Sequence, residues 1–232
     1  MINRRTMLKA LGSSVTLTLI PTAHILAGND RGSKKPAMVI DVRRCTGCLS
    51  CSLACAIENG TPKGMTRNQV RQFSIPQNDG YGAMAIPTQC GNCDHPTCTE
   101  PCPVAATGKT KNGVVYLNQD TCIACQICVE HCPYGARAGD TEARLPPEKC
   151  DFCIARSSHG LLPACVESCA GHARIFGDLN NPESKIVQTI KSHQVYTMLE
   201  SKETGPKIYY IGLPETTDDK KVLTLNYLNW QR

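Results

Sequence analysis

The apolar residues of the chain come in short runs that are separated by polar turns. Runs rich in β-branched residues predict strands at Met38–Val42, Gly113–Leu117 and Ala173–Gly177. The first strand leads through a loop into Ser52–Glu58, for which we expect a short helix. This succession of strand, turn, loop and short helix occurs more than once, and it predicts an α+β fold built on an internal repeat.

Two further predicted strands stand apart from the repeat. Val70–Ile75 and Tyr81–Ile86 lie on either side of Pro76–Gly80, which is a cluster of turn-forming residues. The pattern predicts a β-hairpin insertion that packs on the core of the fold.

Residues 179–232 form a predicted C-terminal extension. Asn181-Pro182 favours the start of a helix, with asparagine as the N-cap, that runs to about His193. A last strand is expected at Lys207–Ile211. From Leu213 the chain is polar, and this tail either docks on a partner as an exposed arm or forms a loosely packed terminus.

Residues 1–27 have the pattern of an export signal. The segment Asn3-Arg4-Arg5-Thr6-Met7-Leu8-Lys9 resembles the twin-arginine motif, and the uncharged run Ala10–Ala27 is weakly apolar and interrupted by Pro21. The alternative is a pair of chance arginines before a membrane helix. We expect a periplasmic protein that is exported folded, with residues 28–37 as a polar, basic linker.

All sixteen cysteines fall into four runs of four, and none is left over. The third run has the spacing C-x2-C-x2-C-x3-C-P, which is the ligand pattern of bacterial ferredoxins. The second run also ends in Cys-Pro, and the fourth has eleven residues between its second and third cysteines. In order, the runs are Cys45, Cys48, Cys51 and Cys55; Cys90, Cys93, Cys98 and Cys102; Cys122, Cys125, Cys128 and Cys132; and Cys150, Cys153, Cys165 and Cys169.

Three uses of these cysteines compete. Disulfides would suit an exported chain, but every run contains a C-x2-C pair, which is badly placed to bridge itself. Structural zinc uses paired C-x2-C knuckles, whereas these quartets end in a lone fourth cysteine. Iron–sulfur clusters fit the quartets. Aromatic residues are only 5% of the chain, so metal–thiolate bonds would also help to hold the fold together.

The spacing also predicts which cysteines share a cluster. In two-cluster ferredoxins each run gives three ligands to one cluster and its last cysteine to the other. The second and third runs should exchange their last cysteines in this way, and by analogy so should the first and fourth. The predicted ligand sets are Cys45, Cys48, Cys51 and Cys169 for cluster 1; Cys150, Cys153, Cys165 and Cys55 for cluster 2; Cys90, Cys93, Cys98 and Cys132 for cluster 3; and Cys122, Cys125, Cys128 and Cys102 for cluster 4.

The predicted clusters would change the net charge of the protein. The formal net charge is +5, and Arg4, Arg5 and Lys9 of the predicted signal account for three of the basic residues. Four oxidised clusters with their thiolates would add about −8, so the mature holoprotein would be mildly acidic. Nothing in this balance argues for nucleic-acid binding. With all sixteen thiolates used, we predict no catalytic residue and no open iron position, and the chain would conduct electrons.

Several charged or imidazole side chains lie near the cysteines in sequence. Cations there either raise the cluster potentials or are ordinary solvated charges; the candidates are Arg43, Arg44, Arg137, Lys149 and Arg156. Complete cysteine quartets need no histidine ligand, so we predict no such role for His95, His131 and His172.

The order and spacing of the runs across Met38–Gly177 resemble the four-cluster iron–sulfur subunit of the molybdopterin oxidoreductases. The stretches Ile40–Cys48, Ile57–Asn59, Pro133–Arg137, Leu162–Cys169 and Ala173–Asp178 look most similar to the tetrathionate reductase subgroup. The resemblance implies four [4Fe–4S] clusters and the pairings given above. It also implies tandem bacterial ferredoxin-like modules within residues 38–178, the inner one (88–140) nested inside the outer one (38–60 with 145–178).

The same resemblance implies a complex of three kinds of subunit. A molybdopterin-containing catalytic subunit would reduce the substrate, and a polytopic membrane subunit would oxidise quinol. This chain would relay electrons between them, with cluster 1 nearest the catalytic subunit. The terminal substrate stays open, because its pocket would lie on another chain.

Two other functions remain as alternatives. The first is an electron relay to a multihaem cytochrome or a hydrogenase without a molybdenum partner, which the neighbouring gene would distinguish. The second is a binding module that is stapled by metals or disulfides. Acid-labile sulfide in the purified protein would exclude this second alternative.

Overall fold

The computed structural model describes residues 34–77, 80–140, 142 and 144–213 of the chain. The predicted export signal, most of the predicted linker and the tail beyond Leu213 lie outside the described residues. None of the helices in the described part is long and apolar enough to cross a membrane.

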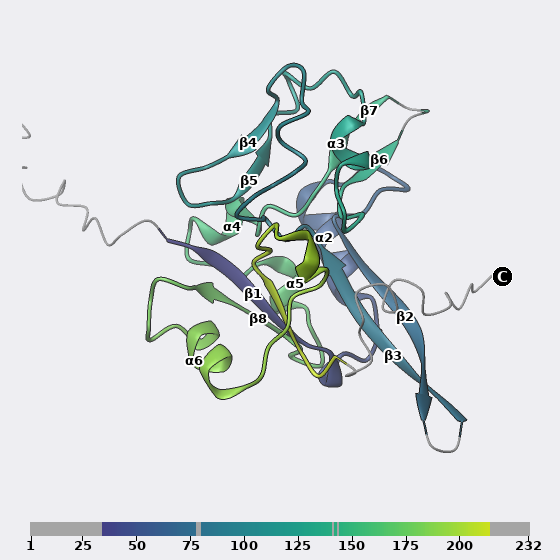
Figure 1. Ribbon diagram of the computed structural model, residues 1–232, viewed down its shortest axis with the longest axis vertical. Helices are drawn as coiled ribbons and strands as arrows, with labels where there is room; N and C mark the ends of the chain where they lie inside the picture. Colours follow the sequence, from purple (N-terminus) through teal and green to yellow (C-terminus); the bar gives the residue numbers. More distant parts are fainter. Residues whose placement is uncertain (1–33, 78–79, 141, 143, 214–232) are drawn as a thin grey trace, which may run out of the picture. The chain divides into compact units, whose positions relative to one another are not determined.

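A three-stranded sheet joins the two ends of the described chain (Figure 1). Its central strand is β1 (Pro36–Asp41), which pairs antiparallel with β8 (Arg174–Asp178) and parallel with β9 (Ile208–Ile211). In this register Val39 lies opposite Ile175. The sheet therefore brings residues before the first cysteine run beside residues after the fourth.

The central strand is buried on both faces because its side chains alternate between two cores. Met38 and Ile40 belong to the main core, which also contains cysteines. Ala37 and Val39 belong to a second, smaller core on the other face. Helix α6 (Lys185–Ser192) packs on this second core and covers that face of the sheet (Figure 1).

The prediction of Asn181 as the helix N-cap is wrong. Helix α6 begins at Lys185, and its N-cap is Ser184. The Asn181 side-chain oxygen instead accepts a hydrogen bond from the Glu183 amide at 3.0 Å, and its carbonyl accepts one from the Ser184 amide at 2.9 Å. This side-chain-closed turn takes the residues that were expected to form the first turn of the helix.

Strands β2 (Asn68–Gln77) and β3 (Gly80–Gln89) pair antiparallel along their whole length. They are longer than the sequence pattern predicts, and Figure 1 shows them projecting from the other described elements. Phe73 and Ile86 are buried and join the main core. Because β3 ends immediately before Cys90, this hairpin sets the position of the second cysteine run.

The remaining elements are short and lie between or within the cysteine runs. β4 pairs with β5 and β6 pairs with β7, and of these four strands the sequence pattern predicts only β5. Figure 1 shows these strands and α3 gathered at the top of the view. Their bounds are β4 (Thr107–Lys109), β5 (Val115–Leu117), β6 (Ala138–Asp140) and β7 (Leu145–Glu148); the helices are α2 (Ser50–Asn59), α3 (Ile127–Glu130), α4 (Ile154–Ser157) and α5 (Ala164–Glu167), with 3-10 turns η2 (Val42–Arg44) and η3 (Glu200–Lys202).

Candidate iron–sulfur centres

Each cysteine run begins with the same backbone turn. The residue two positions after the first cysteine has a positive φ in all four runs, which costs non-glycine residues conformational energy. The turn directs an amide at the first sulfur: Ala124 N lies 3.4 Å from Cys122 Sγ, and Phe152 N lies 3.4 Å from Cys150 Sγ. Such donors stabilise a thiolate. The four residues are Gly47 (φ 71°), Asn92 (φ 45°), Ala124 (φ 54°) and Phe152 (φ 59°).

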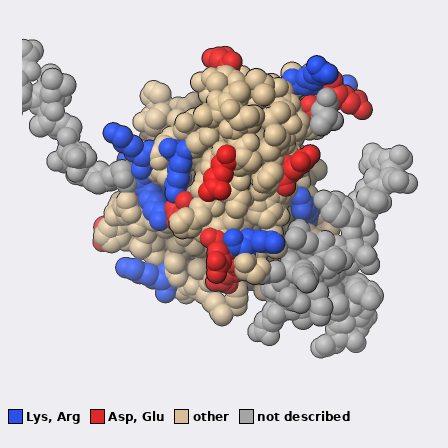
Figure 2. Space-filling view, turned by 45° about the horizontal axis from the view of Figure 1, so that its top comes forward, with Lys and Arg blue, Asp and Glu red and all other residues tan. Residues whose placement is uncertain are grey.

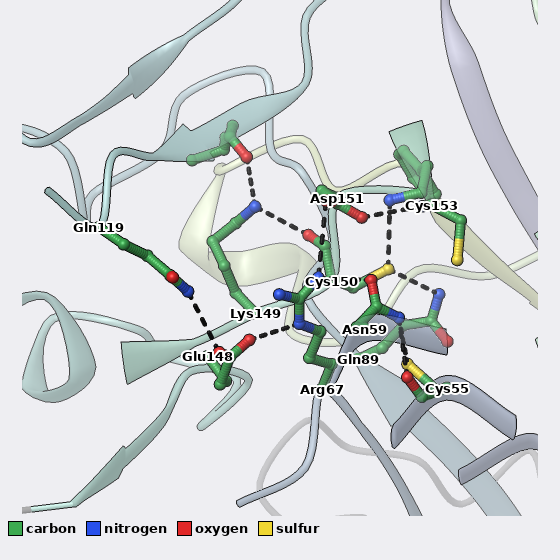
Figure 3. Close-up of polar contacts among 12 residues, drawn as sticks. Cys55, Asn59, Arg67, Gln89, Gln119, Glu148, Lys149, Cys150, Asp151 and Cys153 are labelled. Atoms are coloured by element: carbon green, nitrogen blue, oxygen red, sulfur yellow. Dashed lines mark hydrogen bonds and ion pairs between the residues drawn. The ribbon is translucent and has the colours of Figure 1, made fainter. Parts of the chain in front are cut away.

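Three of the runs also end in a shared turn. The backbone amide four residues after the last cysteine donates to that cysteine's sulfur. In the first run α2 continues past Cys55, and the Asn59 side chain donates instead, with Nδ2 3.6 Å from Cys55 Sγ (Figure 3). The backbone bonds are Ala106 to Cys102 at 3.2 Å, Ala136 to Cys132 at 3.4 Å and Ala173 to Cys169 at 3.3 Å.

Group 1 consists of the predicted ligands of cluster 1. Cys45, Cys48, Cys51 and Cys169 line one small pocket, although the last is far from the others in sequence. Burial raises the pKa of Cys45, and the nearby Cys51 and Cys169 thiolates add to the effect. Cys48 is exposed, and hydrogen bonding with Ser50 lowers its pKa to about 7.

Group 4 consists of the predicted ligands of cluster 4. Cys102, Cys122, Cys125 and Cys128 line a second small pocket, so this group also includes one cysteine from another run. Burial raises the pKa of Cys128. Cys125 is exposed, as Cys48 is in group 1.

Group 3 consists of the predicted ligands of cluster 3. Burial raises the pKa of Cys93 to about 12, and the thiolates of Cys90, Cys132 and Cys98 contribute. The pKa of Cys132 is raised by its burial and by Cys90 and Cys98. The last cysteine of the third run therefore lies with the first three of the second run.

Group 2 consists of the predicted ligands of cluster 2. Burial raises the pKa of Cys55 to about 12, and the Cys165 and Cys153 thiolates contribute. Burial, followed by the Cys165 thiolate, raises the pKa of Cys150 well above its usual value. Figure 3 shows the sulfurs of Cys55, Cys150 and Cys153 together with the Asn59 amide. The last cysteine of the first run thus lies with cysteines of the fourth.

The buried thiols in these groups need a metal in order to ionise. A thiol with a pKa of about 12, such as Cys55 or Cys93, is protonated at neutral pH until a metal displaces the proton. Across the described residues, no three His, Cys, Asp or Glu side chains converge on a point that would hold a single metal ion. A [4Fe–4S] cluster does not require such convergence, because each thiolate binds a different iron.

Comparison with known proteins places the chain in a family. Residues 82–179 match the 4Fe-4S dicluster domain. The chain is 41% identical over 184 residues to a subunit of the tetrathionate reductase of Salmonella typhimurium, and the match covers 77% of this chain and 73% of that protein. The chain belongs to the family of iron–sulfur subunits of the molybdopterin oxidoreductases.

Two other relatives in this family act in different reductases. A subunit of the selenate reductase of Mesobacillus selenatarsenatis is 34% identical over 219 residues, which are 78% of this chain and 75% of that protein. The arsenate respiratory reductase iron–sulfur subunit of Shewanella sp. is 33% identical over 221 residues, which are 75% of this chain and 94% of that protein. The family predicted from the cysteine runs is confirmed.

The four groups fit the cofactor of this iron–sulfur family. Each group offers four sulfurs, most of them shielded from water, and backbone turns supply amide donors to them. The chain carries [4Fe–4S] clusters, and sixteen cysteines in four groups match four of them. The structure groups the sulfurs as the spacing predicts. Which four cysteines bind each cluster stays a prediction.

The cations that the sequence singled out have different surroundings. Arg43 and Arg44 are exposed. Arg156 forms ion pairs with glutamates, and the buried Lys149 ammonium donates to backbone carbonyls. Of the five candidates, Arg137 is the one whose hydrogen bonds to cysteine sulfur are described.

Sequence reasoning missed a second arginine that contacts sulfur, Arg174. A signal was present, because Arg174 follows Cys169 by five residues and Arg137 follows Cys132 by the same interval. Asn59 was also missed. Its donor role depends on α2 extending to Asn59, one residue beyond the predicted end of this helix at Glu58.

Proposed function

We propose that this iron–sulfur subunit relays electrons through four [4Fe–4S] clusters between two partner subunits. The observation that carries the proposal is the linear order of the four cysteine groups, 1-2-3-4. At each junction one side chain contacts a cysteine of both neighbouring groups. Arg174 contacts the sulfurs of Cys51 in group 1 and Cys165 in group 2. The Asn92 amide donates to the carbonyls of Cys150 in group 2 at 3.3 Å and Cys90 in group 3 at 3.4 Å. Arg137 contacts the sulfurs of Cys98 in group 3 and Cys128 in group 4.

The ends of this series are accessible and its middle is not. Cys48 of group 1 and Cys125 of group 4 are exposed, whereas every cysteine of groups 2 and 3 is buried or half-buried. Electrons can therefore enter at one terminal cluster and leave at the other. Shielding of the middle clusters from water favours transfer along the series over loss to solvent.

Exposed apolar residues lie beside both ends. Leu53 and Ile57, which are four residues apart on one face of α2, are 64% and 74% exposed, and Leu49, immediately before the helix, is 54% exposed. Ile123, next to Cys122 of group 4, is 59% exposed. On the face shown in Figure 2, acidic and basic residues are interspersed, so charge of one sign does not dominate that face. Apolar side chains in such positions suit protein–protein interfaces.

The partners we assign come from the family. A molybdopterin catalytic subunit docks at group 1, and a polytopic membrane subunit that oxidises quinol docks at group 4. The relatives above are subunits of tetrathionate, selenate and arsenate reductases, so a respiratory reductase of the tetrathionate type is the proposed complex. The twin-arginine pattern around Arg4 and Arg5 supports folded export and a periplasmic location.

The proposed architecture is two ferredoxin-like modules, with residues 88–140 nested inside residues 38–60 and 145–178. The grouping of Cys169 with the first run, and of Cys132 with the second, supports this nesting. The β2–β3 hairpin would be an insertion between the modules. Residues 179–232 would form the extension, whose described part includes α6 and β9.

The test is to purify the native complex without oxygen and identify the subunits that accompany the chain. The complex is then assayed with reduced viologen on tetrathionate, arsenate and selenate. We expect a molybdenum-containing subunit and oxidation of the viologen by tetrathionate. Copurification with a multihaem cytochrome and no molybdenum would contradict the proposal.

A further inference from the structure

Arg174 lies between group 1 and group 2. The side chain is buried, with Nη2 3.6 Å from Cys51 Sγ and Nη1 3.8 Å from Cys165 Sγ. The side-chain oxygens of Asn68 and Gln89 accept hydrogen bonds from the same two nitrogens. Because the donors of a guanidinium are held in one plane, these four partners fix its orientation, and one cation faces ligands of two clusters.

Arg137 lies in the same way between groups 3 and 4. Its Nη1 is 3.4 Å from Cys128 Sγ, and its Nη2 is 3.3 Å from Cys98 Sγ and 2.8 Å from Thr107 Oγ1. Its Nε is buried and has no hydrogen-bond partner within the described part of the chain. The two arginines thus occupy equivalent positions in the repeat, five residues after the last cysteine of a run.

Neither arginine pairs with a carboxylate of the described residues. The ion pairs of the described residues include Arg43, Arg67 and Arg156 but not Arg137 or Arg174. A buried guanidinium without an anion is unfavourable, and the anions that these two contact are cysteine thiolates. Burial alone would lower the pKa of each arginine, but the thiolates hold both values above the usual one.

We propose that Arg137 and Arg174 are tuning residues, each of which raises the reduction potentials of two neighbouring clusters together. The inference rests on the proposed four-cluster relay. When a cluster accepts an electron its negative charge grows by one, and a cation beside its ligand stabilises the reduced form more than the oxidised form. Since one guanidinium faces a ligand of both clusters, both potentials rise. The four clusters therefore form two pairs, 1 with 2 and 3 with 4, and within each pair one arginine shifts both potentials in the same direction.

Between the two pairs, where group 2 lies next to group 3, the neutral side-chain amide of Gln89 contacts a cysteine sulfur. Gln89 Nε2 lies 3.7 Å from Cys150 Sγ of group 2, and Figure 3 shows this contact. The next residue in the chain is Cys90 of group 3. The nearby Lys149 ammonium donates to the carbonyls of Val115 and Cys150 rather than to a sulfur. A neutral donor shifts a potential less than a contacting charge does, so the step between clusters 2 and 3 is where the two pairs can differ.

The experiment uses the intact complex with Arg174→Met and, separately, Arg137→Met. Iron and acid-labile sulfide are counted first, and the potential of each cluster is then measured by anoxic redox titration followed by electron paramagnetic resonance. Arg174→Met should lower the potentials of clusters 1 and 2 and leave clusters 3 and 4 unchanged. Arg137→Met should do the reverse, so each variant is the control for the other. Unchanged potentials, or a shift confined to one cluster, would overturn the pairing.

Lysine variants keep the test decisive if a methionine variant fails to assemble. Arg174→Lys and Arg137→Lys retain the charge, but an ammonium cannot hold two sulfurs as a planar guanidinium does. The ammonium should support one cluster of the affected pair more than the other, so the two potentials should shift by different amounts, and equal shifts would contradict the inference. Fewer than four clusters in the unmodified complex would instead contradict the proposed function, whereas four clusters with unmoved potentials contradict only this inference.

Discussion

The outer pair of cysteine groups (1 and 2) and the inner pair (3 and 4) share their backbone turns but differ in the side chains around them. In the inner pair, each last cysteine accepts a hydrogen bond from a backbone amide and is followed by proline, at Pro103 and Pro133. In the outer pair, one of these amides is replaced by the Asn59 side chain. The outer pair also contains the eleven-residue stretch between Cys153 and Cys165.

The surroundings of the two buried arginines show the same contrast. Apart from sulfurs, the described hydrogen bonds of Arg137 are to Thr107 alone. Arg174 is held by Asn68 and Gln89, which lie opposite each other where β2 begins and β3 ends. The base of the hairpin therefore does for the outer pair what a single threonine does for the inner pair. Both pairs keep the backbone turns and the buried arginine beside the sulfurs. The residues that hold the arginine in place differ between the two pairs.

The largest expected effect tests the exchange of last cysteines in the inner pair. Cys132→Ser should remove a ligand from the cluster of Cys90, Cys93 and Cys98. Cys132 belongs to the third run in sequence, so without the exchange the substitution would affect the cluster of Cys122, Cys125 and Cys128 instead. Electron paramagnetic resonance of the reduced complex would show that cluster lost or altered, with its neighbours retained. Loss of the cluster of the third run alone would mean that the exchange does not occur.

Cys169→Ser asks the same question of the outer pair, where the exchange was predicted only by analogy. Because Cys169 lines the pocket of group 1, we expect the cluster of Cys45, Cys48 and Cys51 to be affected. An effect on the cluster of Cys150 and its neighbours instead would separate the outer pair from the inner one. The two substitutions are matched, because each removes the last cysteine of a run.

The cysteine groups could be predicted from sequence because cluster ligation restricts spacing more tightly than any propensity does. Of the short strands between the runs, β4, β6 and β7 could not be predicted in this way. Strand β7 (Leu145–Glu148) contains two prolines, which local preference disfavours in strands, and β4 and β6 are three residues each. These segments are extended because the chain around the groups holds them there. Arg174 escaped notice for a related reason, since in sequence it is one more residue of a predicted strand.

The next largest effect concerns the stretch that only the outer pair has. Arg156 bonds Glu58 at 3.0 Å, pairs with Glu167, and donates to the Leu162 carbonyl at 2.8 Å, so it ties α4 to α2 and α5. Its side chain is 19% exposed, and we expect Arg156→Met to cost about 1–2 kcal/mol. The measurement is the rate at which cluster absorbance bleaches in guanidinium, which should rise severalfold.

The matched control for this substitution is Arg43→Met. The Arg43 side chain is 57% exposed, and within the described part of the chain its one ion pair is with Asp41, two residues away, so its loss should change the rate little. Equal bleaching rates for the two variants would show that the Arg156 contacts do not stabilise the outer pair.

A smaller effect is expected from the side-chain donor that distinguishes Cys55. Asn59→Ala removes the Nδ2 hydrogen bond to the Cys55 sulfur and should lower the potential of cluster 2. A neutral hydrogen bond of about 1 kcal/mol corresponds to roughly 40 mV for one electron, which sets the upper end of the shift. Redox titration of the variant measures it. If the potential of cluster 2 does not move, the Asn59 side chain does not replace the backbone hydrogen bond that the sulfur of each of the other three last cysteines accepts.

The smallest effect belongs to the inner pair and depends on pH. Asp94, next to Cys93, lies 3.3 Å from the Lys35 ammonium, 3.4 Å from that of Lys109 and 3.5 Å from that of Lys207. Burial alone would raise the pKa of Asp94, but these three ammonium groups lower it below its usual value. Because the carboxyl is partly exposed, Asp94→Asn should cost less than about 1 kcal/mol at pH 7.

The direction of the pH effect follows from the lowered pKa of Asp94. The carboxylate stabilises the fold fully above the unfolded-state pKa of about 3.9, and this contribution is lost as the pH falls through the lower folded-state value. The bleaching rates of Asp94→Asn and the unmodified complex should therefore differ at pH 7, and the difference should stay the same down to about pH 5, because the carboxylate remains ionised there. Added salt should reduce the difference at pH 7, because exposed charges are screened. A difference that persists at high salt would mean that Asp94 supports the inner pair through packing rather than through its charge.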